Sequence, residues 1–430
     1  MNTVCVHGLG HIGLPTAAVL AQHGYQVYGY DSDVERREAI ERHNIPTNEA
    51  GLQTVVSDGL REESLIISDQ PIRADIHLIC VPTPMQWETY TADLGYVKDA
   101  ALAVADRLRS GDAVILESTV PPGTTVQQLL PLLETSGLTA GDEFDLAYSP
   151  ETVLPGAIMH ELRTNDRIVG GINTAASQTA VELYESFVTG EIRAVPDPTT
   201  AEFVKLIQNT FRDVNIALAN ELAKIAADYD IDARLGIDLA NAHPRVNIHD
   251  PGPGVGGHCL PIDPWFLAEN SDELDIISTA RAVNDGMSRY VARQVDTALG
   301  GVDGRHIAIL GIAYKGNVGD IRMSPGLALA DALTSLETSL SVHAADGGNV
   351  NRVDLRYHDP HAVDAPVALV DLETAVTNAD AIIITSDHDD YANLEPAWLA
   401  SRMNDTVLVD TKAMLDRDRW EETGFTVLRI

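Results

Sequence analysis

The stretch TVCVHGLGHIG, residues 3–13, decides how the chain begins to fold. Residues 3–7 are mostly apolar and β-branched, which predicts a short buried strand. The glycines of GLGHIG at 8–13 follow at the spacing GxGxxG, and apolar residues then recur at helical spacing over 14–23. A glycine turn between a buried strand and a helix lets a pyrophosphate approach the helix N-terminus. The stretch therefore predicts a dinucleotide-binding unit.

The next apolar run, YQVYGYD, ends on Asp31, about 20 residues beyond the glycines. In this fingerprint an acid at the end of the second strand accepts a hydrogen bond from the ribose 2′-hydroxyl and repels a 2′-phosphate. The cofactor expected is therefore NAD rather than NADP. A glycine-rich turn alone is weak support and also occurs as a purely structural turn, but strand, helix and acid in this order favour the nucleotide site.

Strands and helices continue to alternate after this unit, which predicts an α/β fold with a parallel, doubly wound sheet. Two turns, PTP at 82–84 and STVPPGTT at 118–125, lie beyond strand ends, where ligands bind in such sheets. Turns of this composition are also common without any function, so the residues alone do not assign them one. The expected strands span 75–81, 113–118, 144–148, 167–171 and 191–195, and the expected helices span 93–109, 124–134 and 174–187.

The middle of the chain predicts a helical domain followed by a second α/β domain. Apolar residues recur at helical spacing over 199–229 without a strong breaker, which predicts one helix about 45 Å long. A second helical run covers about 273–299, and strand–helix alternation resumes after the turn at 300–305. The segment 338–352 has no clear periodicity and is expected to be a surface insertion. The expected domains are 1–197, 198–300 and 301–430.

The charge balance limits the partners of the chain. The 29 lysine and arginine residues face 64 aspartate and glutamate residues, which gives a net charge of −35. Such a surface repels nucleic acid and anionic membranes, and no apolar run is long enough to span a bilayer. Arginine is much preferred to lysine, and this acidic composition resembles that of proteins from salt-loving, halophilic archaea. The first residues already predict a strand, so no signal peptide is expected and a cytoplasmic location is predicted.

The three cysteines predict neither a disulfide framework nor a metal site. Cys5 and Cys80 fall inside apolar strand-like runs and are expected to be inert core residues. No CxxC and no helical HxxxH pair is present, so zinc is not expected. Cys259 differs, because it stands in PGPGVGGHCLPIDPWF, residues 251–266. Glycine loses the most backbone freedom on folding, so a loop this rich in glycine suggests a close-fitting turn that presents Cys259 to a ligand.

Together these motifs resemble the UDP-glucose/GDP-mannose dehydrogenase family, in order and over nearly the whole chain. The GGHC loop with DPWF behind it, VLPG and NDRIVGG look most like the branch that acts on UDP-N-acetylmannosamine. The resemblance implies two Rossmann-like domains, the second binding a UDP-sugar, joined by a central helical domain with one long helix. The matching motifs are GLGHIG, PTP, STVPPGTT, SPETVLPG, EFVKLIQNTFRDVNIALANEL, GPGVGGHCLPIDP, GIAYKGNVGDIRMSP and YHDP.

The family oxidises a sugar hydroxymethyl group to a carboxylate with two NAD⁺ and one water, and this implies a role for the cysteine loop. After a first hydride transfer the aldehyde must gain an oxygen that carries charge before a second hydride can leave. The resemblance implies that the Cys259 thiolate adds to the aldehyde, and that the thiohemiacetal is oxidised to a thioester, which water hydrolyses.

Five further residues match catalytic positions of the family. Lys205 and Asn209, four residues apart in the expected long helix, would otherwise be an ordinary polar stripe. The resemblance implies that they handle the alcohol proton and steady the developing oxyanion. It also implies that Asp263 and Thr119 orient the hydrolytic water and that Glu151 acts as an acid–base group.

The resemblance also implies binding residues. Arg245 matches an arginine that reaches a neighbouring subunit, which predicts a homodimer or a higher homo-oligomer. Lysine is rare here, and three of the five lysines fall on these positions, as a diphosphate site in so acidic a chain requires. The expected cofactor residues are Gly8, Gly10, His11, Ile12, Gly13, Asp31, Pro82, Thr83, Thr119 and Arg322. The expected substrate residues are Glu151, Leu154, Lys205, Asn209, Arg245, Gly256, Gly257, Lys315 and Lys412.

Three alternatives remain at this level. Thr152 stands where the hexosamine branch often has arginine, and Pro155 stands where the glucose branch has glutamate, so UDP-N-acetylglucosamine or UDP-glucose is an alternative substrate. A nucleotide-sugar binder that has lost turnover would need none of the catalytic set. A two-electron hydroxyacid dehydrogenase would need neither the cysteine loop nor the third domain.

Overall fold

The computed structural model describes residues 2–45, 49–341 and 352–430. Most of the 338–352 segment lies outside the described residues, and residues 338–341 end helix α13 (Pro325–Ser341). The chain divides into two compact units, which are described separately. Unit 1 comprises Met1–Gln208 and Asp263–Glu273, and unit 2 comprises Asn209–Ile262 and Leu274–Ile430.

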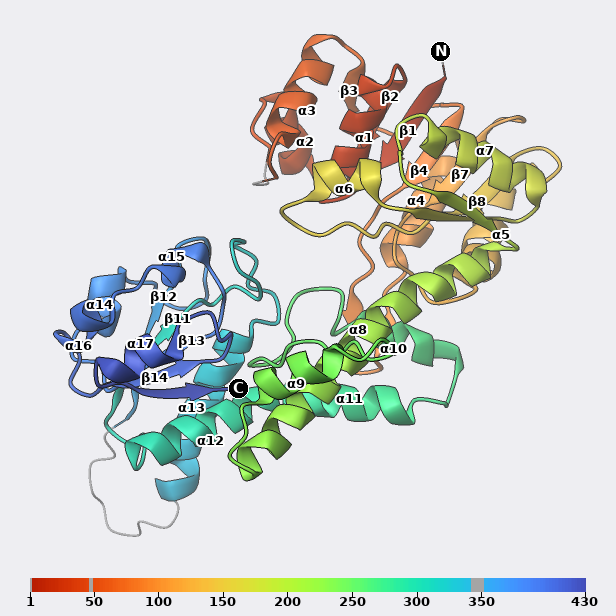
Figure 1. The fold of residues 1–430 in the computed structure, drawn as a ribbon. Helices are drawn as coiled ribbons and strands as arrows, with labels where there is room; N and C mark the ends of the chain where they lie inside the picture. The colour runs from red at the N-terminus through yellow and green to blue at the C-terminus, as the bar shows by residue number, and fades with distance from the viewer. Residues whose placement is uncertain (1, 46–48, 342–351) are drawn as a thin grey trace. The chain divides into compact units, whose positions relative to one another are not determined.

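Unit 1 is built on an eight-stranded sheet in the order β10-β9-β8-β7-β4-β1-β2-β3. One face is covered by α1, α2, α3, α6 and α7, and the other by α4, the π-helical turn η1 and α5 (Figure 1). The strands are β1 (Thr3–His7), β2 (Gln26–Tyr30), β3 (Leu65–Ser68), β4 (Ile76–Ile79), β7 (Ala113–Leu116), β8 (Asp145–Tyr148), β9 (Arg167–Gly171) and β10 (Ile192–Val195). The helices are α1 (Gly13–Gln22), α2 (Val34–Glu41), α3 (Leu52–Arg61), α4 (Gly95–Ala105), η1 (Thr125–Leu129), α5 (Leu130–Leu133), α6 (Ile158–Thr164) and α7 (Thr174–Glu185).

The predicted α/β fold is confirmed, with one difference in strand direction. Strand β9 pairs with β8 in antiparallel fashion, and β10 is parallel to β9, so these two strands run against the other six. A parallel partner needs a crossover that returns the chain to the starting end of the sheet. Here the segment 149–166 stays near the end of β8, where Arg167 pairs with Glu151. The next strand therefore begins there and runs back.

The helical middle follows the predicted pattern. Helix α8 (Pro198–Asp228) is one continuous helix of 31 residues, and the boundary between the two units falls within it. The second predicted run is divided at Gly286 into two helices. The remaining elements are α9 (Ala233–Asn241), α10 (Asp263–Phe266), η3 (Leu267–Asn270), α11 (Asp275–Asp285) and α12 (Met287–Leu299).

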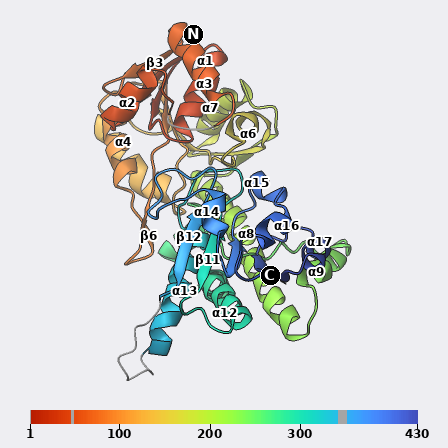
Figure 2. The same cartoon turned by 90° about the vertical axis from the view of Figure 1, so that its left-hand side faces the viewer.

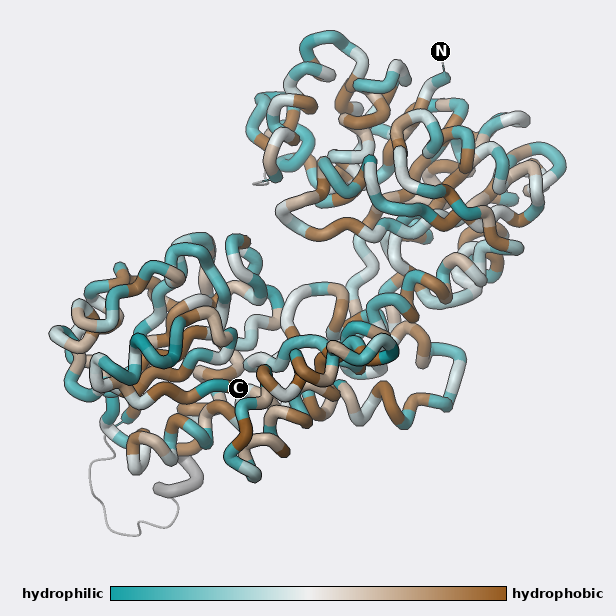
Figure 3. The backbone as a smooth tube through the Cα atoms, viewed as in Figure 1, coloured by the Kyte–Doolittle hydropathy of each residue, from teal (hydrophilic) through white to brown (hydrophobic). Residues whose placement is uncertain are grey.

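Unit 2 contains a five-stranded sheet in the order β12-β11-β13-β14-β15, with every pair parallel (Figure 2). Helices α12 and α13 pack on one face, and α14 to α17 pack on the other. Both faces are covered, so the central strands β11, β13 and β14 are mostly apolar and buried, whereas the edge strand β12 carries polar residues (Figure 3). Among the described helices, none combines the length and apolar character of a membrane span. The elements are β11 (His306–Leu310), β12 (Asp354–His358), β13 (Ala381–Ile384), β14 (Val407–Asp410), β15 (Thr426–Arg429), α14 (Leu372–Val376), α15 (Asp389–Ala392), α16 (Pro396–Ala400) and α17 (Arg417–Glu422).

Candidate active site

The glycines of the GLGHIG turn have distinct roles in unit 1. Gly8 adopts φ +94°, and a Cβ there would lie 2.6 Å from the carbonyl oxygen of Cys80. A Cβ on Gly13 would lie 1.9 Å from the carbonyl oxygen of Gly8, so α1 could not approach the turn with any larger residue. A Cβ on Gly10 would meet only the end of an arginine side chain, at 3.4 Å. Gly10 is thus the position where a pyrophosphate can approach the backbone, which fits a dinucleotide.

Asp31 links the end of β2 to this turn. Its Oδ2 accepts from the N–H of Leu9 at 2.7 Å, and its Oδ1 accepts from the N–H of Asp33 at 2.9 Å. His11 is exposed and Ile12 stands at the N-cap of α1, where it offers no capping side chain. The first N–H groups of α1 and the Asp31 carboxylate are therefore the groups that would hold the phosphates and the ribose of NAD.

The PTP and STVPPG turns are joined by side-chain hydrogen bonds. The Thr83 hydroxyl donates to the carbonyl oxygen of Thr119 at 2.6 Å, and the Ser118 hydroxyl donates to that of Val81 at 2.7 Å. Pro82 is exposed beside them. The two predicted cofactor turns thus form one rigid edge at the carboxyl ends of β4 and β7.

Glu202 on α8, which the sequence did not single out, holds the second turn. Its carboxylate accepts from the N–H groups of Gly123 and Thr125 at 2.5 and 2.8 Å and from the Thr125 hydroxyl at 2.6 Å. Burial raises the pKa of Glu202 to about 7, and these hydrogen bonds oppose the shift. Glu202 fixes the PPGTT turn against the helix that carries Lys205.

Lys205 and Glu151 are brought together in the same unit. The Lys205 ammonium donates to the main-chain carbonyl of Glu151 at 2.6 Å, and both side chains are buried. The Glu151 carboxylate accepts from the N–H groups of Thr152 and Val153 at 2.6 and 3.0 Å and from Arg167 at 2.6 Å. Glu151 therefore shapes its own loop and supplies the carbonyl that holds Lys205.

A buried ionic cluster lies behind Glu151. Arg167 also lies 3.6 Å from Glu117 and packs 4.5 Å from the centre of the Tyr184 ring. Burial lowers the pKa of Arg167, but Glu151 and Glu117 raise it by more. Glu117 accepts from the Tyr184 hydroxyl at 2.7 Å and from the Cys80 thiol at 3.1 Å. The cluster could not be predicted from the sequence, because its five members come from five segments that are well separated along the chain.

In unit 2 the glycines before Cys259 are required by close packing. A Cβ on Gly256 would lie 2.6 Å from the carbonyl oxygen of Met323, and Gly257 (φ +88°) lies against the Tyr314 ring. The Gly257 N–H donates to the carbonyl oxygen of Arg322 at 2.9 Å. The loop is thereby held against the 314–325 segment, and Cys259 itself is exposed at its end.

The loop has two further anchors on helices of unit 2. The Gly252 N–H donates to Asn220 on α8 at 2.8 Å, and Arg234 on α9 donates to the carbonyl oxygen of Pro251 at 2.6 Å. Arg322 interacts electrostatically with Cys259 and is oriented by a two-pronged ion pair with Asp320. The predicted nucleophile thus stands on a rigid loop with a cation nearby.

Lys315 and Lys412 follow β11 and β14, two strands that flank β13. Asp387, just beyond β13, accepts from the N–H of Gly316 at 3.1 Å and lies 3.6 Å from the Lys412 ammonium. One carboxylate therefore connects the two lysine loops. Arg245 is exposed in the segment after α9, where its N–H donates to His243.

The remaining predicted residues are also placed. Asn209 is buried on α8, and Asp263 is buried at the start of α10. Burial raises the pKa of Tyr148, and the nearby carboxylates of Glu202 and Asp263 add to the shift. Leu154 is 39% exposed, and its N–H donates to Glu161. Each unit thus gathers its own share of the predicted set, with the cofactor turns, Glu151 and Lys205 in unit 1 and the cysteine loop, Arg322 and both substrate lysines in unit 2.

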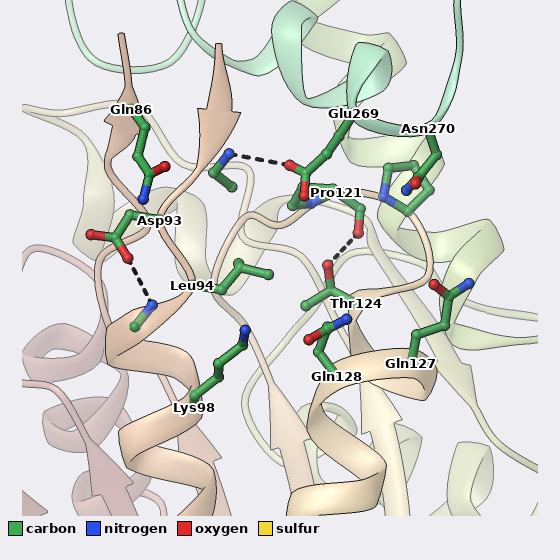
Figure 4. Close-up of a pocket in the computed structure, with 13 residues that line it drawn as sticks. Gln86, Asp93, Leu94, Lys98, Pro121, Thr124, Gln127, Gln128, Glu269 and Asn270 are labelled. Carbon is green, nitrogen blue, oxygen red and sulfur yellow. Dashed lines mark hydrogen bonds between the residues drawn. The ribbon is translucent and has the colours of Figure 1, made fainter. Parts of the chain in front are cut away.

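A separate hollow of 390 Å³ in unit 1 is polar and contains none of the predicted catalytic residues (Figure 4). Lys98 on α4 and Gln128 on η1 point into it, and Glu269 on η3 accepts from the N–H of Ala92 at 3.1 Å. Its walls carry amide groups and both signs of charge, and no cysteine lines it. The hollow borders the STVPPGTT turn through Pro121, Pro122 and Thr124, and the predicted catalytic residues lie outside it.

Comparison with known proteins agrees with this geometry. The chain matches the UDP-glucose/GDP-mannose dehydrogenase family in its NAD binding domain over residues 2–188, its central domain over 199–286 and its UDP binding domain over 308–417. The chain therefore belongs to this family of NAD-dependent dehydrogenases. The match to a UDP binding domain removes the two-electron hydroxyacid dehydrogenase alternative.

Individual relatives show which members of the family this chain resembles. The chain is 41% identical to the UDP-N-acetyl-D-mannosamine dehydrogenase of Methanococcus aeolicus, over 99% of this chain and 94% of that protein. It is 39% identical to the protein of the same name from Salmonella typhi, over 96% and 99%. The solved structure of UDP-D-ManNAc dehydrogenase from Pyrococcus horikoshii aligns with a TM-score of 0.89 at 37% identity, covering 100% of this chain and 99% of that one.

Proposed function

We propose that this protein oxidises the C6 hydroxymethyl group of UDP-N-acetylmannosamine to a carboxylate, giving UDP-N-acetylmannosaminuronate. The observation that carries the proposal is similarity over the full length to relatives of that name. The rigid loop that presents Cys259, with Arg322 nearby, supports the same chemistry. UDP-N-acetylglucosamine and UDP-glucose remain the alternative substrates, because Thr152 and Pro155 fit neither branch fully.

The reaction balances with two hydride transfers and one water. NAD⁺, when bound, accepts a hydride in each of the two oxidations. The Cys259 thiolate adds to the aldehyde carbon, and the resulting thiohemiacetal loses its hydride to become a thioester. Water then breaks the carbon–sulfur bond and releases the carboxylate and the thiol. The sum is one CH₂OH, two NAD⁺ and one water giving one carboxylate, two NADH and three protons.

The other residues take the roles that their positions favour. Lys205, held by the Glu151 carbonyl, and Asn209 act on the sugar oxygen, as proton carrier and hydrogen-bond donor. Thr119 and Asp263 orient the hydrolytic water. The three hydrogen bonds on the Glu151 carboxylate favour a positioning role beside the acid–base role predicted for it. Lys315 and Lys412 neutralise the diphosphate.

We further propose a homodimer of chains with domains 1–197, 198–300 and 301–430. Phe211, Leu218 and Ile225 on α8 recur at about two-turn spacing and are 53%, 46% and 45% exposed. A stripe of exposed apolar residues along one helix is suited to a second copy. A nucleophilic thiol also persists best in a reducing compartment, so we place the protein in the cytoplasm.

The test is a panel of UDP-sugars with NAD⁺, with NADH and uronate both counted. Two NADH per uronate, and UDP-N-acetylmannosamine as the best substrate, support the proposal. Cys259→Ala should fold and bind the UDP-sugar but form no uronate, and a thiol alkylator should inactivate the wild type unless UDP-sugar protects it. Near wild-type uronate formation by Cys259→Ala would remove the nucleophile. Sugar binding with no turnover by the wild type would favour the non-catalytic binder.

A further inference from the structure

Three metal-ligating side chains converge in the core of unit 1, outside the site described above. Cys5 and His7 lie two residues apart on β1 and therefore share a face of the sheet. His77 on β4 lies directly opposite Cys5 in the parallel register. One candidate ligand atom from each of the three side chains lies within 4.8 Å of the other two, and all three residues are at most 1% exposed.

The two imidazoles face each other across the paired strands. His7 Nε2 and His77 Nδ1 lie 3.2 Å apart, so one ring can donate to the other. His7 Nδ1 and His77 Nε2 have no hydrogen-bond partner among the described residues. These two outer nitrogens stay unpaired whether or not an ion lies between the facing pair, so only the facing nitrogens and the Cys5 sulfur point to a ligand.

We propose that Cys5, His7 and His77 form a buried structural site for one zinc ion. Tetrahedral zinc with Zn–N bonds of about 2.0–2.1 Å holds two ligating nitrogens about 3.3 Å apart, close to the observed 3.2 Å. The apparent binding energy of structural zinc, about 10–16 kcal/mol in small domains, far exceeds that of the single hydrogen bond between the rings that the ion would replace. Asp75, on the same strand edge, is occupied by Thr3 at 2.8 and 2.9 Å and does not join the set.

The Cys5 thiol supplies the third candidate ligand atom. Cys5 is fully buried, and burial raises the pKa of its thiol to about 11. The main-chain N–H of Ile72 interacts with the sulfur and lowers the pKa, as expected for a group that stabilises a thiolate. A divalent ion deprotonates a coordinating thiol outright. His7 is followed directly by Gly8, so the ion would tie β1 to β4 immediately beneath the dinucleotide turn.

The first experiment measures zinc in the full-length protein, purified without a metal-affinity step and dialysed against EDTA. We expect one zinc per chain in the wild type and in Cys259→Ala, which removes a thiol elsewhere. We expect zinc at background level in Cys5→Ala and in His77→Phe. Zinc that persists in the Cys5 and His77 variants is adventitious binding to the acidic surface and overturns the proposal, as does a zinc-free wild type.

A second measurement keeps the proposal testable if those variants fail to fold. Wild-type chain refolded with Co²⁺ should show thiolate-to-cobalt charge-transfer absorption and tetrahedral visible bands, and Cys5→Ser should lose the charge-transfer band. Refolding with Cu⁺ is the competing arm, because a Cys–His–His set also holds soft ions in three-coordinate form. Retention of copper but not of zinc or cobalt overturns the zinc assignment. Refolding with no bound metal in any arm overturns the site.

Discussion

The first turns of the two sheets share the same backbone geometry. Gly8 after β1 and Gly311 after β11 have φ +94° and +88°. The Gly8 N–H donates to the carbonyl oxygen of Tyr30 at 2.8 Å, and the Gly311 N–H donates to that of His358 at 2.8 Å. Each strand thus turns away from its neighbour at the same point of a parallel pair.

An acid follows the second strand in both sheets. Asp31 after β2 accepts from the Leu9 N–H at 2.7 Å, and Asp359 after β12 accepts from the Ile312 N–H at 2.7 Å. The two carboxylates then differ in what else they bind. Asp31 has one further backbone donor, Asp33, so it retains acceptor capacity for a ribose hydroxyl.

The acceptor positions of Asp359, in contrast, are filled by hydrogen bonds from the same unit. It accepts from the N–H groups of Ala313, His361 and Ala362 and from His388 Nε2 at 3.1 Å. Burial opposes ionisation, but these hydrogen bonds hold the pKa of Asp359 well below its usual range. The same strand–turn–acid geometry can therefore serve a ligand in one sheet and stability in the other.

The segment after the turn explains why the two acids differ. In unit 1, α1 begins at Gly13, so the phosphates can reach its N-terminus. In unit 2, α13 begins only at Pro325, and the longer segment carries Lys315 and Arg322. A long loop that presents cations must be fixed by something, and Asp359 and His388 fix it, because His388 Nδ1 accepts from the N–H of Asn317 at 2.9 Å.

The largest expected effect is a difference in the free energy of unfolding between variants at Asp359 and at Asp31. Asp359→Asn should lower the free energy of unfolding by about 3–5 kcal/mol, because it breaks a buried, fully paired charge. Asp31→Asn should cost about 1 kcal/mol, because only two backbone donors are affected. Urea unfolding at pH 7 measures both. Equal losses would contradict the distinction drawn here.

The pH dependence of stability in the same variants tests whether the charge on Asp359 stabilises the fold. The folded-state pKa of Asp359 is depressed, so its contribution is present above the unfolded pKa of 3.8 and is lost as the pH falls below it. The stability gap between wild type and Asp359→Asn should therefore shrink below about pH 4. A gap that is constant with pH would show that the charge of Asp359 is not what stabilises the turn.

Glu202 is a third buried acid, and its shift has the opposite sign. Its folded-state pKa is raised from 4.5 to about 7, so its contribution is present below pH 4.5 and is lost as the pH rises to 7. Against Glu202→Gln, which cannot ionise, the wild type should lose up to about 3 kcal/mol of relative stability between pH 4.5 and 8. Thermal unfolding of both proteins across that range measures the difference. A difference that does not change with pH would contradict the raised pKa.

A smaller expected effect concerns the preference for NAD⁺ over NADP⁺, which we assign to Asp31. Asp31→Ser should raise the ratio of kcat/KM for NADP⁺ to that for NAD⁺ about tenfold, because the repelling carboxylate is gone. Arg36, 3.7 Å from Asp31 in the wild type, would then face a 2′-phosphate. Asp359→Ser, assayed where it remains folded, is the matched control and should leave the ratio unchanged. Equal use of both cofactors by the wild type would contradict the role of Asp31.

Local patterns made the first turn predictable from the sequence. GLGHIG and Asp31 lie within one βαβ unit, so spacing alone identified both the glycines and the acid. The alternation of strands and helices, the long helix and the second α/β domain were predictable for the same reason, since each depends on the periodicity of a continuous segment. The catalytic roles came from family resemblance and stay predictions.

Contacts between distant segments were not predictable. Glu202 meets the PPGTT turn nearly 80 residues away in sequence, and Arg167 pairs with acids from two separate segments that follow strands. His77 joins Cys5 only because β1 and β4 are neighbours in the sheet. The reversal of β9 was missed because strand direction depends on where the preceding loop packs, which single-sequence periodicity does not report.

The smallest expected effect separates buried charge from surface charge. At a net charge of −35 the folded chain repels itself, and this repulsion is screened as the Debye length falls from about 10 Å at 0.1 M salt to about 3 Å at 1 M. The melting temperature should therefore rise in molar KCl, by about 2–4 °C for each kcal/mol regained.

The charge on Asp359 is buried and locally paired, so the stability deficit of Asp359→Asn should persist in salt. A neutral osmolyte at matched osmolality controls for solute exclusion from the surface. A melting temperature that stays flat or falls with KCl would contradict the role of surface repulsion, and a deficit that vanishes in salt would show that Asp359 acts through the same screened field as the surface acids.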